Sequence, residues 1–315
     1  MMLRLATRGS RLALWQAEHV RTRLEAAHPR ITVMVHEFRT TGDRIADAPL
    51  AAIGGAGLFT SELDARVRAG DADAAVHSLK DVPTIPSDDL SIGAVLVRED
   101  PRDAYVPAAG RARTLRELPP HARVGTSSLR RRALLRETRP DLDVLDLRGN
   151  LDTRLARLDA GDLDAAVLAR AGIRRLDRDD VIGEILEAPP WLPAAGQGAI
   201  AILVRADDAA AAALVAPLDD PPTRSATTAE RAFLRRLQGG CQVPIGGLAH
   251  VTGDTLTLDG FVSDLDGATP LRAQRHGPVA QAAEVGVALA DDLLARGARA
   301  ILDSLRGPVL PASAP

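Results

Sequence analysis

Apolar positions in the first two thirds of the chain alternate between a strand-like and a helix-like spacing. Short apolar runs predict strands at 3–6, 31–38 and 72–76. Between them, Ser10 can cap a helix with an apolar stripe, and a second predicted helix over 58–69 ends before Gly70. A loop is expected over 40–57. This alternation predicts mostly parallel sheets with right-handed crossovers.

The same alternation of strand and helix patterns begins again after residue 120. Strands are predicted at 122–125, 142–147 and 164–168, and helices at 128–137 and 151–158. Residues 69–76 read AGDADAAV and residues 160–167 read AGDLDAAV. Either both copies follow the same helix-to-strand turn chemistry, or the chain contains two related α/β lobes. In the second case, the residues after each copy lie at strand ends that bind ligands.

The pattern changes from about residue 217, which predicts a small α+β domain. Thr227 and Glu230 have capping-box spacing at the start of an expected helix. The PPTRS segment before it is the expected linker. The remaining predicted elements are strands at 249–251 and 255–262 and a long helix through 282–293 that breaks at Gly297.

Composition excludes several classes of function. The 315 residues carry a net charge of −3 and 2% aromatic residues, which argues against a nucleic-acid-binding protein. No run of about twenty apolar residues predicts a membrane span. The first ten residues do not resemble a secretory signal, so we expect a cytoplasmic protein. The single cysteine forbids an intrachain disulfide, and the scattered histidines predict no metal site.

One lysine, Lys80, stands among 39 basic residues, directly before Asp81 in AAVHSLKDVP. A compositional bias toward arginine explains its rarity equally well at this point. Its position after the predicted strand 72–76 favours a place at the end of the strand.

Two strand-to-helix junctions have the character of anion sites, because hydroxyl groups, free backbone N–H groups and arginines meet there. The alternative for each is a capped helix with a solvated basic face. Arginines at later turns add to the expectation of a ligand with several negative groups. The residues concerned are Arg8, Ser10 and Arg11 in ATRGSRLAL, Thr126, Ser127, Ser128, Arg130 and Arg131 in VGTSSLRRR, and Arg148, Arg154, Arg174 and Arg175.

Cys241 lies between glycine pairs in QGGCQVPIGG. A lone cysteine is commonly a small buried hydrophobe, but this glycine-rich setting equally allows a thiol that serves as a covalent anchor. In the loop 40–57, Asp43 is the candidate for a ligand contact.

Together these motifs resemble the hydroxymethylbilane synthase family, also called porphobilinogen deaminases. The matching stretches are LATRGSRLALWQA, GLFTSEL, AAVHSLKDVP, REDPRDAYV, VGTSSLRRRALL, DLRGNLDTRL, PAAGQGAI and GGCQVPIGG. They are spread over almost the whole chain, in the family's order.

The resemblance implies an α/β fold with two periplasmic-binding-protein-like lobes, a cleft between them and a small C-terminal α+β domain. The implied first lobe is discontinuous and comprises 1–98 with 196–216. The second lobe is 99–195, and the domain with the cofactor cysteine is 217–315.

The family condenses four porphobilinogen molecules head to tail, with loss of ammonia, on a dipyrromethane cofactor. By resemblance, Cys241 holds the cofactor and Asp81 is the catalytic carboxylate. The implied cofactor contacts are Lys80, Ser78, Thr126, Ser128, Arg130, Arg131, Arg148 and Asp43. The implied substrate contacts are Arg8, Ser10, Arg154, Arg175 and Gln197. The resemblance also implies a monomer whose product passes to uroporphyrinogen-III synthase.

These roles agree with the charges involved. Each pyrrole carries two carboxylates, which an arginine-lined cleft can hold, and the Asp81 carboxylate can stabilise the cation that forms when the substrate amine leaves. Ala52, Ala56 and Ser61 stand where the family often has lysines, which puts ligand contacts of that lid region in doubt. The alternative function is a non-catalytic two-lobed protein that binds a small polyanion.

Overall fold

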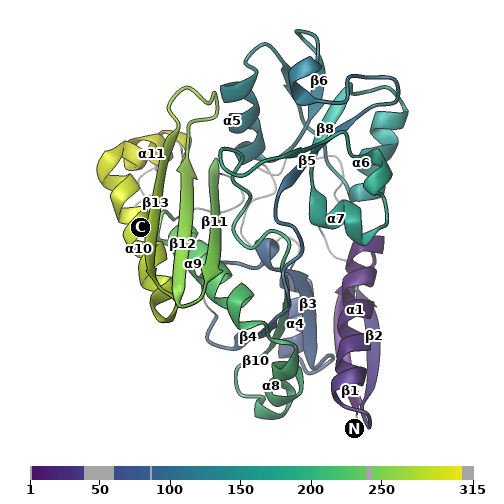
Figure 1. Ribbon diagram of the computed structural model, residues 1–315. Coiled ribbons are helices and arrows are strands. Elements are labelled where there is room, and N and C mark those ends of the chain that lie inside the picture. Colours follow the sequence, from purple (N-terminus) through teal and green to yellow (C-terminus); the bar gives the residue numbers. More distant parts are fainter. Residues whose placement is uncertain (1, 39–59, 86, 239–242, 307–315) are drawn as a thin grey trace, which may run out of the picture.

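Three β-sheets organise the molecule in the computed structural model (Figure 1). The structure describes residues 2–38, 60–85, 87–238 and 243–306. Asp43, Ala52, Ala56 and Cys241, and the predicted loop 40–57, lie outside these residues. Within the described ranges, no helix is long and apolar enough to cross a membrane.

The first lobe is built on a five-stranded sheet of order β2-β1-β3-β10-β4. β1, β2 and β3 are parallel, while β10 runs antiparallel to both β3 and β4. Its strands are β1 (Met2–Arg8), β2 (Thr32–Phe38), β3 (Ala74–Ser78), β4 (Leu90–Val95) and β10 (Ile200–Arg205). Its helices are α1 (Arg11–Ala27), α4 (Ser61–Arg68) and α8 (Ala209–Val215).

The second lobe repeats this plan in a sheet of order β7-β6-β8-β5-β9. Again three strands are parallel, and the fourth, β5, runs antiparallel to the third. Its strands are β5 (Asp103–Pro107), β6 (Arg123–Gly125), β7 (Asp143–Leu145), β8 (Ala165–Ala169) and β9 (Glu184–Leu186). Its helices are α5 (Leu129–Thr138), α6 (Leu151–Asp159) and α7 (Arg170–Arg175).

The repeated sequence pattern marks equivalent positions in the two lobes, which confirms the prediction of related lobes. The first copy leads into β3 and the second into β8, each the third strand of its sheet. Gly70 and Gly161, which end the preceding helices, have φ angles of 74° and 76°, a region that glycine occupies without strain.

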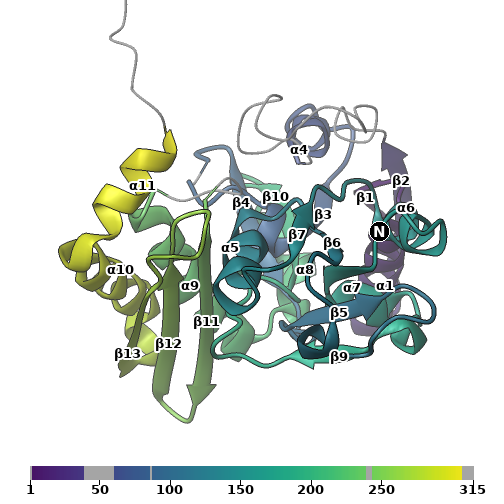
Figure 2. The same ribbon diagram turned by 90° about the horizontal axis from the view of Figure 1, so that it is seen from above.

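The C-terminal domain packs the helices α9 (Pro221–Arg236), α10 (Ala282–Leu293) and α11 (Arg299–Arg306) against a three-stranded sheet. In Figures 1 and 2 this sheet stands beside both lobes, with α10 on the side away from them. The sheet has the order β11-β12-β13, from β11 (Ile245–Thr252), β12 (Thr255–Val262) and β13 (Leu271–Pro278). The helix break predicted at Gly297 is confirmed, with φ of 106°.

The predicted start of α9 was wrong. The helix begins at Pro221 and not near Thr227, because Asp220 caps it by accepting from the backbone N–H of Thr223 and proline is tolerated in the first turn. The PPTRS segment is therefore helix and not linker. Glu230 is not a capping residue either, since its side chain is fully buried in contacts with other elements.

Candidate active site

β3 ends in a short 3₁₀ turn, Leu79–Asp81, at the edge of the first lobe. Leu79 is fully buried and anchors the turn, while Lys80 and Asp81 are half-buried. Gly196, from the segment that returns to this lobe, packs so closely that a Cβ there would lie 3.2 Å from the backbone nitrogen of Lys80. Leu79 and the close packing of Gly196 therefore fix one side of the turn, and Lys80 and Asp81 lie on its other side.

Asp103, the first residue of β5, forms the buried centre of the site. Its carboxylate has no solvent exposure and lies 2.8 Å from Nη1 of Arg130 and 2.8 Å from Nη2 of Arg131. Burial alone would raise the pKa of Asp103, but the two guanidinium groups lower it below its usual range. One carboxylate thus fixes two arginines at the start of α5.

Gln197 joins this centre to Lys80. Its Nε2 donates to the Asp103 carboxylate at 2.9 Å, and its Oε1 lies 3.4 Å from both Nζ of Lys80 and Nη2 of Arg131. Burial lowers the pKa of Lys80 to about 8, and the Asp81 carboxylate opposes that shift. The ammonium therefore lies in crowded, partly desolvated surroundings.

A second group of cations lies around the start of α6. Arg154 donates from Nε to the carbonyl of Gly149 at 2.9 Å. Burial lowers its pKa to about 10, with Arg131 and Arg148 acting in the same direction and Asp81 against them. In the described part of the chain, Nη1 of Arg148 is buried and has no hydrogen-bond partner. Positive charge from the second lobe thus gathers near Asp81 of the first lobe without full compensation.

The predicted hydroxyl groups lie at the two helix starts and at the end of β3. Ser10 caps α1, as predicted, and Ser128 caps α5, by accepting from the N–H groups of Ala13 and Arg131. Thr126 accepts from the N–H of Ser128, and Ser78 accepts from the side-chain amide of Gln16 at 2.9 Å. Arg8, at the end of β1, is half-buried. Each hydroxyl keeps acceptor capacity for a ligand.

Arg130 and Arg175 are tied into the protein more tightly than the sequence suggested. Nη1 of Arg130 also donates to the carbonyl of Leu192 at 2.8 Å, and the residue is 4% exposed. Arg175, 7% exposed, donates to the carbonyl of Gly198 and lies 5.7 Å from the ring centre of Trp15. Burial lowers the pKa of Arg175 to about 10. Direct ligand contacts of these two arginines stay predictions.

Sequence reasoning gave Asp103 and Glu230 no place in the site, although the first lies in a quoted motif. The available signal was a charged residue at the start of the otherwise apolar run DAYV, where a buried carboxylate requires partners. Ser61, from the predicted lid region, is the first residue of α4 and donates to Glu62.

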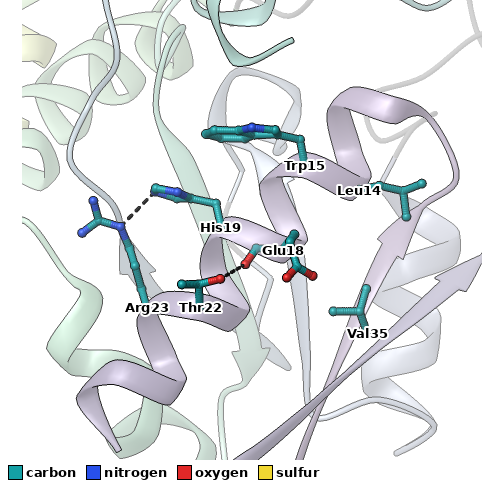
Figure 3. A pocket seen from close by; sticks show the side chains of 7 residues that line it. All are labelled: Leu14, Trp15, Glu18, His19, Thr22, Arg23 and Val35. Carbon is teal, nitrogen blue, oxygen red and sulfur yellow. Dashed lines mark hydrogen bonds between the residues drawn. The ribbon is translucent and has the colours of Figure 1, made fainter. Parts of the chain in front are cut away.

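A shallow hollow lies elsewhere, on the side of α1 that faces β2 (Figure 3). Trp15 and His19 stack there with ring centres 4.9 Å apart, and Nε of Arg23 lies 2.9 Å from the His19 ring. None of the predicted site residues lines it. In the described ranges, no cluster of three or more His, Cys, Asp or Glu side chains is arranged to hold a metal ion.

Comparison with known proteins decides the family. The model of the porphobilinogen deaminase dipyrromethane cofactor binding domain matches residues 3–213, and that of the porphobilinogen deaminase C-terminal domain matches 225–295. The chain belongs to the porphobilinogen deaminase family. It is therefore a transferase of tetrapyrrole synthesis with a dipyrromethane cofactor, and the alternative of a non-catalytic binding protein is not favoured.

Individual relatives agree along nearly the whole length. Porphobilinogen deaminases of Syntrophotalea carbinolica and Roseiflexus sp. are 49% and 51% identical to the chain, over 96% and 95% of it and 96% and 97% of their own lengths. Among solved structures, the VFT2 domain of Bordetella pertussis BvgS covers 68% of this chain and 85% of its own, with 15% identity and a TM-score of 0.43. The two-lobed description follows from the strand orders given above.

Proposed function

We propose that the surface between the turn Leu79–Asp81 and the starts of α5 and α6 is the site at which porphobilinogen units are joined. The observation that carries this is the excess of positive charge facing one carboxylate. Lys80, Arg148 and Arg154 lie in desolvated surroundings, and Nη1 of Arg148 has no partner among the described residues. A ligand with several carboxylates satisfies these cations.

The dipyrromethane cofactor fits this donor set, because its carboxylate side chains require cations that are already partly removed from water. When bound through Cys241, it supplies the pyrrole end to which substrate units are added. The proposed contacts of this chain with it are those of Ser78, Lys80, Thr126, Ser128, Arg130, Arg131, Arg148 and Asp43.

Asp81 acts on the charge that develops in the substrate. When the substrate amine leaves as ammonia, positive charge grows on the pyrrole, and a fixed carboxylate nearby lowers the energy of that state. The Asp81 carboxylate has no hydrogen-bond or ion-pair partner within the described part of the chain. Its oxygens are therefore available to pyrrole N–H groups.

Arginines and neighbouring polar groups position the substrate. Arg154 reaches the site from the second lobe, and Gln197 from the segment between the lobes. Contacts from both sides hold the reacting atoms of cofactor and substrate together, which lowers the entropic part of the barrier. The proposed substrate contacts are Arg8, Ser10, Arg154, Arg175 and Gln197.

The finer proposals concern organisation and context. The proposed domains are 1–98 with 196–216, 99–195, and 217–315. We expect the chain to act as a cytoplasmic monomer and to pass its product to uroporphyrinogen-III synthase.

Intact mass and product formation test the proposal. The purified chain should exceed its sequence mass by two pyrrole units, and Cys241→Ser should lose that excess. Incubation with porphobilinogen should give hydroxymethylbilane. A fully folded wild-type chain that stays unmodified after exposure to porphobilinogen would contradict the proposed function.

A further inference from the structure

The Asp103 carboxylate receives hydrogen bonds from three side chains that lie on two different segments. Arg130 donates at 2.8 and 3.4 Å, Arg131 at 2.8 and 3.1 Å, and Gln197 at 2.9 Å. Pairing with two arginines accounts for a buried carboxylate. The third donor, Gln197, is uncharged. Its hydrogen bond therefore has a role other than neutralising the carboxylate.

The bond from Gln197 determines which way its amide points. Nε2 has two acceptors, the Asp103 carboxylate and the carbonyl of Pro101 at 2.6 Å. Oε1 has two donors, Lys80 and Arg131. The opposite orientation would place donors against donors and acceptors against acceptors, so the network admits one orientation. In that orientation an acceptor faces the Lys80 amine.

Charges around Lys80 act in both directions. Asp81 and Asp103 favour its ammonium form, whereas Arg131 and Arg154 disfavour it. Removal of Asp103 would leave Arg131 uncompensated and take away one of the two acceptors that orient the Gln197 amide. Both changes favour the neutral amine, which donates weakly and cannot pair with a carboxylate ligand.

We propose that Asp103 is a positioning residue that keeps Lys80 in its cationic form, by orienting the Gln197 amide and by offsetting the charge of Arg131. Asp103 acts through these neighbours. The consequence for catalysis, that Lys80 stays charged to bind ligand carboxylates, rests on the proposed function. The inference about the protonation state of Lys80 does not rest on the proposed function.

The sequence offers a direct reporter, because Lys80 is the only lysine. A protein labelled with ¹³Cε-lysine gives one lysine side-chain signal, whose chemical shift follows the protonation of Nζ. We expect Asp103→Asn to lower the titration midpoint by about one pH unit relative to the wild type. Asp103→Glu should bring the titration midpoint of Lys80 most of the way back to the wild-type value. Intact mass establishes that compared samples carry the same cofactor load.

Asp164→Asn is the matched control, since Asp164 also pairs with arginine in the second lobe but at the opposite end of β8. It should leave the midpoint unchanged. Gln197→Met removes the acceptor without changing charge and should lower the midpoint by a smaller amount. Gln197→Met serves as the test of the proposal if Asp103→Asn does not fold or does not load the cofactor.

An unchanged midpoint in Asp103→Asn overturns the proposal, as does an unchanged midpoint in Gln197→Met where the first variant is unusable. The pH dependence of kcat/KM for porphobilinogen gives a second readout, and its alkaline limb should move with the Lys80 midpoint. If Lys80 responds as expected but the wild type does not convert porphobilinogen, the proposed function fails and the inference about Asp103 stands.

Discussion

Glu230 binds Arg98 with both carboxylate oxygens, at 2.6 and 3.1 Å. The same carboxylate accepts from the backbone N–H of Gly196 at 2.7 Å and of Ala249 at 2.9 Å. Arg98 precedes the first crossing between the lobes, and Gly196 belongs to the second. A single buried side chain of α9 therefore holds both crossings and the sheet of the C-terminal domain.

Loss of this carboxylate should destabilise the whole molecule. Glu230→Ala leaves Arg98 and two backbone N–H groups buried without their partner, at an expected cost of about 3–5 kcal/mol in the free energy of unfolding. Denaturant unfolding followed by far-UV circular dichroism measures it. Asp291→Ala, which breaks the exposed pair with Arg236, should change the free energy of unfolding by no more than about 0.5 kcal/mol. Equal effects of the two variants would contradict the role of Glu230.

Asp81→Asn should slow pyrrole addition and leave the fold intact. The carboxylate makes no bond that holds the described structure together, so the melting temperature should stay that of the wild type. Loss of a charge facing a developing cation should reduce kcat by about 100- to 1,000-fold. Single-turnover assays with porphobilinogen measure this, with the exposed Asp88→Asn as control. Near-normal turnover would show that the charge of Asp81 contributes little.

Lys80 should make ligand binding sensitive to alkaline pH. Its pKa of about 8 means that the cation is present below that pH and is lost as the pH rises through it. Affinity for carboxylate ligands should therefore fall over the same range. Lys80→Arg should flatten this fall, because a guanidinium stays protonated, although its wider head should reduce turnover at neutral pH. KM for porphobilinogen between pH 7 and 9 tests this. An identical alkaline fall in Lys80→Arg would assign it to another group.

Local sequence signals predicted the parallel strands of the lobes and the helices α1, α4, α5 and α6, because those signals are also satisfied locally in the structure. The strands β4, β5, β9 and β10 and the helices α7 and α8 were not predicted. Ser10 and Ser128 cap helices, Gly70 and Gly161 end them, and the apolar runs form strands. The helix start at Pro221 was missed because two residues, Asp220 and Thr227, can each cap a helix here. Asp220, which directly precedes the proline pair, is the cap in the structure.

The centre of the site could not be read from local patterns. Asp103, Arg131, Gln197 and Lys80 are brought together by β5, α5, a crossing between the lobes and the turn after β3, so their proximity exists only in the folded chain. The motifs identified the arginines and Lys80. The buried carboxylate that fixes them carries no local signature beyond its charge.

Each lobe contains the same kind of stabilising interaction at an equivalent position. This gives a prediction about the additivity of two substitutions. The second Asp of each repeated pattern binds the second strand of its sheet, β1 or β6, in the same manner. Asp73 accepts from the backbone N–H of Arg4 at 2.8 Å and pairs with its guanidinium, and Asp164 does the same with Arg123 at 2.8 Å. Asp73→Ala and Asp164→Ala should each lower the free energy of unfolding by about 1–3 kcal/mol.

Because the two pairs lie in different sheets with no shared partner, the double variant should lose the sum of the single losses within about 0.5 kcal/mol. Arginine hydrogen bonds lower the pKa of both carboxyl groups, and for Asp73 they outweigh the opposing effect of burial. Their contribution is therefore present above the unfolded pKa of about 3.9 and is lost as the pH falls through the lower folded values. Denaturant unfolding at pH 7 and at pH 3 should show smaller differences between wild type and variants at the lower pH. A double variant whose loss departs from the sum by more than about 1 kcal/mol would show instead that the two lobes unfold as coupled parts.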